Sequence, residues 1–242
     1  MDFFSDNARL PVKSPNGASH WWHSLPLPDG TRIEGMSHDQ DLQSKIWRAL
    51  QLQSPLLAGK AVLDIGANDG YFTVASLLSG ASEVTAINSA DWPTYPQNIE
   101  FACRAWNVHP TIVTADFRNH SFGRKFDVIL FLGVLYHVEN VFDCVKDLRC
   151  LLRPSGKILI ETQMAKSVSE LPIFEYASDI YPTSAIAGKS SLGQVGISNY
   201  LFPNVHAMRN LASCYDFEFE DIGLGSAYVN ENPHRGIFQF SI

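Results

Sequence analysis

One stretch of this chain decides its fold: Lys60-Ala61-Val62-Leu63-Asp64-Ile65-Gly66-Ala67-Asn68-Asp69-Gly70-Tyr71-Phe72. It opens with an apolar run that is too short for a helix, and it ends in an amphipathic segment. Between them lies a turn with glycines four residues apart. This pattern predicts a strand, a Gly-rich turn and a helix. The free N–H groups at the start of that helix would favour a negatively charged ligand.

The turn itself predicts the ligand. Gly66 lets a ligand approach the backbone closely, and Asp64 can accept a hydrogen bond from a cationic or hydroxylated group. The spacing Asp-x-Gly-x-x-x-Gly departs from the dinucleotide fingerprint, Gly-x-Gly-x-x-Gly. It resembles motif I of class I S-adenosyl-L-methionine (SAM) methyltransferases, which holds the methionine end of SAM. The alternative is a Rossmann-like turn for another nucleotide. The resemblance implies that SAM binds Asp64, Gly66, Ala67, Asn68 and Gly70.

Composition narrows the class of protein. The chain has 242 residues, 45% of them hydrophobic, which suits one α/β domain with an added segment. The net charge of -7 argues against a general nucleic-acid binder, although it permits a local basic patch. The four cysteines show no Cys-x-x-Cys spacing, so neither a zinc site nor a disulfide framework is expected. Cys103, Cys144 and Cys214 fall in predicted helices, where we expect them to pack as small hydrophobic residues.

Targeting signals are not apparent. Residues 1–10 have neither a basic n-region nor an apolar h-region, and no apolar run reaches membrane-spanning length. We therefore expect a cytoplasmic protein without a membrane partner.

Strands alternate with helices from residue 38 onward, which predicts a Rossmann-like α/β fold with a mostly parallel seven-stranded sheet and an antiparallel C-terminal hairpin. The expected helices cover 38–53, 71–79, 96–108, 141–152 and a segment opened by Pro203. The expected strands cover 60–65, 84–88, 111–114, 125–132, 157–162, 217–223 and 236–242. We assign 1–37 to an N-terminal arm and active-site cap, 38–242 to the methyltransferase domain, and 164–202 to a lid or substrate loop.

The segment around Trp21 and Trp22 has two interpretations. Two indole rings flanked by His20 and His23 are costly to leave in water. They either cap the active site or form an edge segment that covers the core.

Several polar residues follow the expected strands. Ligands of such sheets bind at the carboxyl ends of the strands, so one crevice should gather Asp64, Gly66, Asn88, Asp116 and the Tyr136-His137 pair. The position that commonly carries an acid for the ribose hydroxyls holds Asn88, followed by Ser89; an amide can still bind a hydroxyl, but without charge assistance. Asp116 and Phe117 would meet adenine, or Asp116 is an ordinary turn residue. Leu132 completes the predicted cofactor-binding residues.

A set of motifs extends the resemblance: Trp22-His23, Asp29-Gly30, Asp64–Gly70, Gly133-Val134-Leu135-Tyr136-His137, Arg153-Pro154-Ser155-Gly156 and Glu161-Thr162. Together they are similar to the family of the tRNA wobble-uridine enzyme that makes 5-carboxymethoxyuridine, and to its shorter methyltransferase relatives. The similarity covers roughly residues 20–163, 199–203 and 233–235.

That tRNA enzyme uses carboxylated SAM, whose extra carboxylate is bound by a Lys upstream of motif I, by the Tyr of Leu-Tyr-His and by a C-terminal Arg. Tyr136 and Arg235 match the last two. The expected Lys-Gly-Pro stretch is absent, because residues 33–38 read Ile-Glu-Gly-Met-Ser-His. We also expect the N-terminal extension of the tRNA enzyme to be missing. Loss of a cation weakens the prediction of a doubly anionic donor.

Candidate catalytic residues follow from the chemistry of methyl transfer. An oxygen acceptor needs a base, whereas an amine need only be neutral. His137 is the first candidate for this base and His23 the second, although either can be a locally bonded structural His. Tyr136 would orient the acceptor or line the sulfonium of SAM. Trp22, Glu161, Tyr200 and Arg235 are predicted to bind substrate, with ion pairing or a structural role as the alternative for Glu161 and Arg235.

Three functions remain open. The first is a methyltransferase that converts SAM to S-adenosyl-L-homocysteine (SAH) by O- or N-methylation of a small molecule, in specialised metabolite biosynthesis. The second is a tRNA wobble-uridine (carboxy)methyltransferase; a basic row of Lys146, Arg149, Arg153 and Lys157, assigned mainly to one helix face, could contact phosphates or simply be solvated. The third is a non-catalytic SAM-binding module, for which Asn88 is the hint. The sequence does not indicate an oligomeric state.

Overall fold

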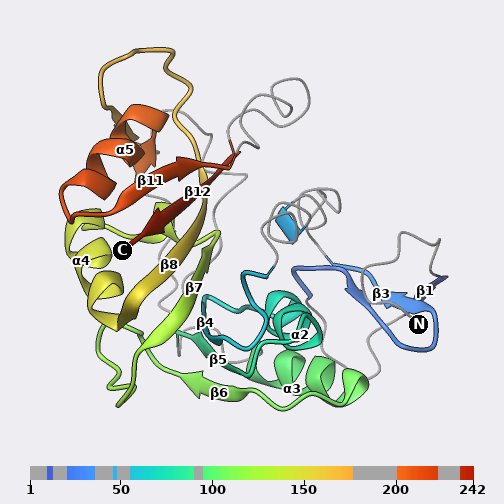
Figure 1. The fold of residues 1–242 in the computed structure, drawn as a ribbon. Helices are drawn as coiled ribbons and strands as arrows, with labels where there is room; N and C mark the ends of the chain where they lie inside the picture. Colours follow the sequence, from blue (N-terminus) through green and yellow to red (C-terminus); the bar gives the residue numbers. More distant parts are fainter. Residues whose placement is uncertain are drawn as a thin grey trace. The chain divides into compact units, whose positions relative to one another are not determined.

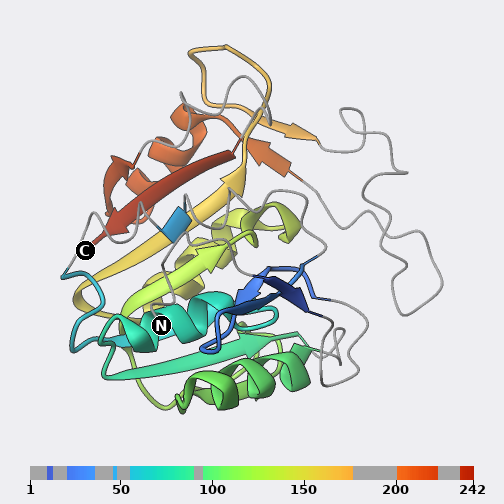
Figure 2. The ribbon, with the colours of Figure 1, turned by 90° about the vertical axis from the view of Figure 1, so that its right-hand side faces the viewer.

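The computed structural model of the chain describes residues 10–12, 21–35, 46–47, 55–89, 95–176, 201–222 and 235–242 (Figures 1 and 2). The chain divides into two compact units, Met1–Ser121 and Phe122–Ile242. Of the expected helix over 38–53, only Ile46 and Trp47 are described, and both are helical and buried.

The first unit contains a parallel three-stranded part of the sheet, in the order β4 (Ala61–Ile65), β5 (Glu83–Asn88) and β6 (Thr111–Thr114). Every residue of β4 is buried, as expected for an apolar strand of a parallel sheet. The helices α2 (Tyr71–Leu78) and α3 (Tyr95–Trp106) pack against each other and against these strands (Figure 1). The predicted strand–turn–helix is therefore confirmed.

A small second sheet lies in the same unit, in the order β1 (Leu10–Val12), β3 (Thr31–Ile33), β2 (Leu25–Pro26). Residues 10–12, the described part of the first 20 residues, thus form a strand. The turn between β2 and β3 is built by Asp29, whose Oδ1 accepts hydrogen bonds from the backbone and hydroxyl of Thr31 at 2.8 and 2.6 Å. Trp21 is buried edge-on against Phe101 of α3, with ring centroids 5.9 Å apart. Trp21 therefore covers the core, whereas a cap role of this segment over the active site stays a prediction.

The second unit contains β7 (Phe126–Leu132) parallel to β8 (Leu152–Gln163), then β12 (Arg235–Ser241) and β11 (Glu218–Asp221), each antiparallel to its neighbour. This confirms the predicted C-terminal hairpin. Along the chain, β7 is followed by the short helix η1 (Leu135–His137) and the helix α4 (Val141–Leu151), and then by β8. Phe126, Phe131, Phe238 and Phe240 fill the core.

Because β8 begins at Leu152, two members of the basic row, Arg153 and Lys157, lie on a strand, so the assignment of the row mainly to one helix face is wrong. Cys103 and Cys144 are buried, as predicted, but Cys214 caps the end of α5 (Val205–Ser213) and is exposed. Cys214 lies just past the last turn, where the apolar face no longer meets the core.

Two short strands interrupt the segment expected to be irregular. β9 (Phe174–Tyr176) pairs antiparallel with β10 (Leu201–Pro203) (Figure 2). Residues 177–200, which hold most of the predicted lid, lie outside the described residues. No described helix is both long and apolar enough to cross a membrane.

The start of α5 corrects another prediction. Pro203 is the last residue of β10, and Asn204 is the residue that caps the helix. The buried Asn204 amide accepts hydrogen bonds from the N–H groups of Ala207 and Ile173, at 2.8 and 3.1 Å. It also donates to the carbonyls of Ser169 and Leu171, at 3.0 and 2.7 Å. One side chain thus joins the helix to the loop before β9.

Asn204→Ala should lower the free energy of unfolding by about 2–3 kcal/mol, because it removes a helix cap and leaves buried backbone groups unpaired. The matched control is Asn140→Ala. Asn140 caps α4 from an exposed position and accepts from the Asp143 N–H at 3.1 Å, so its loss should cost about 0.5–1 kcal/mol. Urea unfolding of both variants measures the difference, and equal losses would contradict this account of Asn204.

Candidate active site

The Gly-rich turn joins β4 to α2 through a backbone conformation at Gly70 that favours glycine. Gly70 has φ of 90°, and a Cβ there would lie 3.2 Å from Ile99 of α3. A side chain at this position would therefore strain the turn and push α3 away. Gly70 caps α2 without a side-chain hydrogen bond, and the start of a helix favours a negatively charged group.

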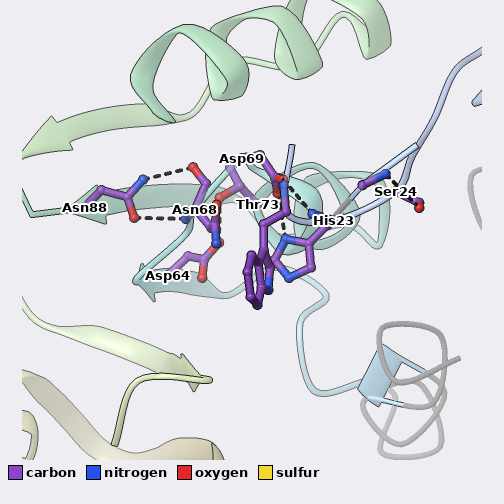
Figure 3. A network of polar contacts seen from close by, with 9 residues as sticks. His23, Ser24, Asp64, Asn68, Asp69, Thr73 and Asn88 are labelled. Atoms are coloured by element: carbon purple, nitrogen blue, oxygen red, sulfur yellow. Dashed lines mark hydrogen bonds and ion pairs between the residues drawn. The ribbon is translucent and has the colours of Figure 1, made fainter. Parts of the chain in front are cut away.

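Asn88, at the end of β5, holds this turn from one side. Its Oδ1 accepts a hydrogen bond from the Asn68 N–H at 2.9 Å, and its Nδ2 donates to the Asn68 carbonyl at 3.0 Å (Figure 3). Asn68 itself has φ of 54°, in the left-handed region that Asn tolerates well. A carboxylate could not donate to the carbonyl, so the paired bonds require the amide. The structure thus gives Asn88 a role that the sequence reasoning missed, while its contact with ribose stays a prediction.

Asp64 lies at the end of β4, with only 2% of its surface exposed. Its Oδ2 accepts a hydrogen bond from the Thr73 hydroxyl of α2 at 2.6 Å. Burial raises the pKa of Asp64 to about 6, although the Thr73 bond and the nearby His23 oppose the shift. A carboxyl group with such a raised pKa destabilises the folded state when it is ionised, which is a common feature of functional sites.

Asp69 holds the turn from the other side, through a segment that lies 46 residues earlier in the chain. The Trp22 and His23 N–H groups both donate to Asp69 Oδ2 at 2.7 Å. The imidazole Nδ1 of His23 lies 2.6 Å from Asp69 Oδ1 (Figure 3). Three hydrogen bonds therefore converge on one carboxylate that is only 1% exposed. Asp69 and Thr73 were not among the predicted site residues. The place of Asp69 inside the Asp64–Gly70 motif could have indicated it.

Gly35 fixes the same segment from behind. A Cβ at Gly35 would lie 2.4–2.6 Å from backbone atoms of Trp22, His23 and Ser24, far closer than real contacts. Its N–H also donates to the Ser24 hydroxyl at 3.1 Å. Gly35, which stands in the segment that replaces the expected Lys-Gly-Pro stretch, thus packs its backbone on the backbone around His23.

The predicted adenine site is a tight turn after β6. Asp116 accepts a hydrogen bond from the Arg118 N–H at 2.9 Å, and it pairs with the Arg118 guanidinium at 2.6 Å. This Arg118 partner lowers the pKa of Asp116. Phe117 is buried and Ser89 is exposed. Asp116 therefore has the turn role of the alternative interpretation, and contact with adenine stays a prediction.

The second unit holds a compact cluster of charged and aromatic groups. The Arg235 guanidinium pairs with Glu161, with Nε 2.5 Å from Oε1 and Nη2 3.3 Å from Oε2. Glu161 is 1% exposed and Arg235 20% exposed. The guanidinium also lies over the Tyr136 ring, 5.3 Å from its centroid. The structure thus brings together two predicted substrate-binding residues, Glu161 and Arg235, with the predicted catalytic residue Tyr136, and the buried carboxylate engages Arg235.

The remaining predicted residues are placed as follows. Leu132 ends β7, and the exposed His137 ends η1 with its ring centroid 4.3 Å from that of Tyr136. Trp22 exposes 49% of its surface. Tyr200 lies outside the described residues. That the two groups of residues, one in each unit, line a single crevice stays a prediction.

The raised pKa of Asp64 leads to a test of its role. Asp64→Asn should raise the free energy of unfolding at pH 8 by up to roughly 3 kcal/mol, since about two pKa units at about 1.4 kcal/mol each oppose folding of the ionised group. The gain should shrink as the pH falls from about 6 to 4, because wild-type Asp64 then folds protonated. Urea unfolding at several pH values measures this.

Asp116→Asn is a control for which we expect the opposite change in the free energy of unfolding. Arg118 lowers the pKa of Asp116, so the ionised carboxyl stabilises the fold above pH 4 and loses that effect as the pH falls through the lowered pKa. This variant should be slightly less stable than the wild type at pH 8. A loss of stability in Asp64→Asn at pH 8 would refute the account of Asp64.

Comparison with known proteins agrees with this geometry. A family model described as "Methyltransferase domain" matches residues 37–212. The tRNA U34 carboxymethyltransferase of Methylococcus capsulatus is 32% identical over 148 residues, which are 59% of this chain and 43% of that enzyme. The chain spans about half the length of the curated relatives it matches.

Solved structures show the same fold at lower identity. The N-terminal domain of EvdMO1, solved with SAH and D-fucose, has a TM-score of 0.63 at 20% identity and covers 91% of both chains. A SAM-dependent methyltransferase from Mesorhizobium loti has a TM-score of 0.58 at 16% identity, covering 81% of this chain and 97% of its own. The predicted fold class and family resemblance are confirmed: the chain belongs to the methyltransferase domain family and has the Rossmann-like fold of class I SAM-dependent methyltransferases.

Proposed function

We propose that this chain transfers the methyl group of SAM to an oxygen or nitrogen atom of a small-molecule acceptor, with SAH as the other product. SAM would supply an electrophilic methyl group, and the residues of the chain would bind and align the two reactants. The observation that carries the choice of donor is the ion pair between Glu161 and Arg235.

The turn after β4 suits the methionine end of SAM. The Asn68 Oδ1 is buried and has no hydrogen-bond partner among the described residues. The start of α2 favours a carboxylate, and the buried Asp64 offers an acceptor to an ammonium group. Donors and acceptors for both charged groups of an amino acid thus lie on one turn.

The pairing of Arg235 argues against carboxylated SAM. In the tRNA enzyme that the sequence resembles, the corresponding Arg binds the extra carboxylate of the donor. In this chain the guanidinium already faces the buried Glu161 at 2.5 Å, so a second carboxylate would meet a neutralised pair. Glu34 stands in the segment where the family has its Lys. The pairing of Arg235 with Glu161 and the replacement of the family Lys both favour a donor without the additional charge.

Surface charge favours a small acceptor over tRNA. The net charge is -7, and the basic row is partly engaged within the second unit. Arg153 pairs with Asp127 at 2.8 Å, and Arg149 lies 3.9 Å from Asp216. These contacts compete with phosphate groups, on which the affinity of tRNA binders largely depends.

Calorimetric titration with SAM, SAH and carboxylated SAM tests the choice of donor. We expect SAM and carboxylated SAM to bind with affinities within about threefold of each other, because an extra carboxylate gains little from a paired guanidinium. Glu161→Gln removes the anionic partner and should shift the preference toward carboxylated SAM about tenfold or more. Glu220→Gln is the control, since Glu220 is exposed and accepts a hydrogen bond from Gln239 at 3.0 Å. A tenfold preference of the wild type for carboxylated SAM would contradict the proposal.

A tRNA wobble-uridine (carboxy)methyltransferase is the second candidate. The curated relatives carry that name, and Tyr136 and Arg235 lie together in this chain. Incubation of the protein with total tRNA and methyl-labelled SAM or carboxyl-labelled carboxylated SAM, followed by nucleoside analysis, decides between the two. We expect no label at the wobble uridine, and labelled wobble uridine would establish this second function.

A further inference from the structure

We propose that His23 is the general base of the reaction, that Asp69 positions it, and that the acceptor group is therefore a hydroxyl. This inference rests on the proposed methyl transfer from SAM and goes beyond it by naming the acceptor chemistry. It arises from the first unit alone, in which both residues lie.

The contact with Asp69 selects one tautomer of His23. An ionised carboxylate only accepts hydrogen bonds, so the Nδ1 of His23, 2.6 Å from Asp69 Oδ1, must carry the proton. The other ring nitrogen, Nε2, then has a free lone pair. This is the form of imidazole that can take a proton from a substrate, and a buried carboxylate behind it stabilises the imidazolium that results.

Burial divides the roles of the two residues. The Asp69 side chain is 1% exposed, whereas the His23 side chain is 17% exposed, so part of the imidazole meets solvent while the carboxylate is shielded from it. The ring of His23 lies edge-on to Phe72, with centroids 5.6 Å apart, and 6.1 Å from Tyr71. With its backbone N–H bound to the same carboxylate, the imidazole is held from three sides.

Position in the chain ties this pair to the donor site. Asp69 lies between Asn68 and Gly70, inside the motif predicted to hold SAM, and Asn88 fixes the neighbouring Asn68 (Figure 3). Any movement of the turn therefore moves the imidazole with it. A general base needs this kind of fixed relation to the reacting atoms.

The proposed step moves one methyl group and one proton. The acceptor oxygen forms a bond to the methyl carbon, the bond between that carbon and the donor sulfur breaks, and its electron pair stays on sulfur. The hydroxyl proton moves to Nε2 of His23, and the imidazolium later releases it to water. A neutral amine attacks without losing a proton first, so a built base is of use chiefly to a hydroxyl acceptor.

The variants His23→Ala and Asp69→Asn test the activity. The substrate probes are a panel of phenols and monosaccharides and a matched panel of anilines and amino sugars, with SAH formation as the readout. We expect turnover on the hydroxyl panel, a loss of about 100-fold or more in kcat for His23→Ala, and a KM for SAM within about threefold. Asp69→Asn should also lose kcat, because the amide can donate to Nδ1 and so place the proton on Nε2. His109→Asn is the control, since His109 is exposed and lies between α3 and β6.

A second measurement does not depend on finding an acceptor. Asp64, Asp69 and Tyr71 are described titratable groups beside His23, and burial raises the pKa of Asp64 to about 6, so a pH–rate profile would also report the ionisation of Asp64. Nitrogen-15 NMR of the full chain without ligand reports the tautomer of His23 directly. We expect the proton on Nδ1 in the wild type and on Nε2 in Asp69→Asn.

The outcomes separate this inference from the proposed function. Absence of SAM binding would refute the proposed function, whereas the NMR result would still decide the state of His23. The inference fails if the wild type carries its proton on Nε2, if only amines are methylated, or if His23→Ala keeps kcat within threefold. It also fails if His137→Asn abolishes turnover while His23→Ala does not.

Discussion

The buried carboxylate of Asp69 is the constraint on which the candidate site of the first unit depends. Two backbone N–H groups and one imidazole converge on it, and each bond is short because the acceptor is charged and shielded from water. A buried charge is tolerated only when hydrogen bonds replace its lost hydration. Asp69 therefore needs the segment around His23, and that segment gains a fixed place on the Gly-rich turn.

Two side chains at the same turn have opposite effects on stability. Asn88 uses its whole amide to bind the backbone of Asn68, which stabilises an uncommon left-handed residue. Asp64, by contrast, is buried, and burial raises its pKa, so its ionised form lowers the free energy of unfolding. A chain selected for stability alone would place a neutral residue there, so the retained carboxyl agrees with a ligand-binding role.

Charge is arranged differently in the second unit. Glu161 and Arg235 neutralise each other within a largely buried cluster, and the guanidinium also lies over the Tyr136 ring. Removal of either partner would leave a poorly solvated charge, so the pair is a fixed element of the fold.

Local patterns in the sequence determined much of this protein: the alternation of strands and helices, the Gly-rich turn, the C-terminal hairpin and the family. Such features depend on hydrophobic periodicity and turn chemistry, which neighbouring residues decide. Pro203 and the basic row were assigned wrongly, because the place where an element ends depends on its packing. Only the tertiary structure decided that Asn88 binds a turn 20 residues away, that Arg235 faces Glu161, and that Asp69 holds His23. Those partners are distant in sequence, and no periodic pattern connects them, so their contacts exist only once the chain has folded.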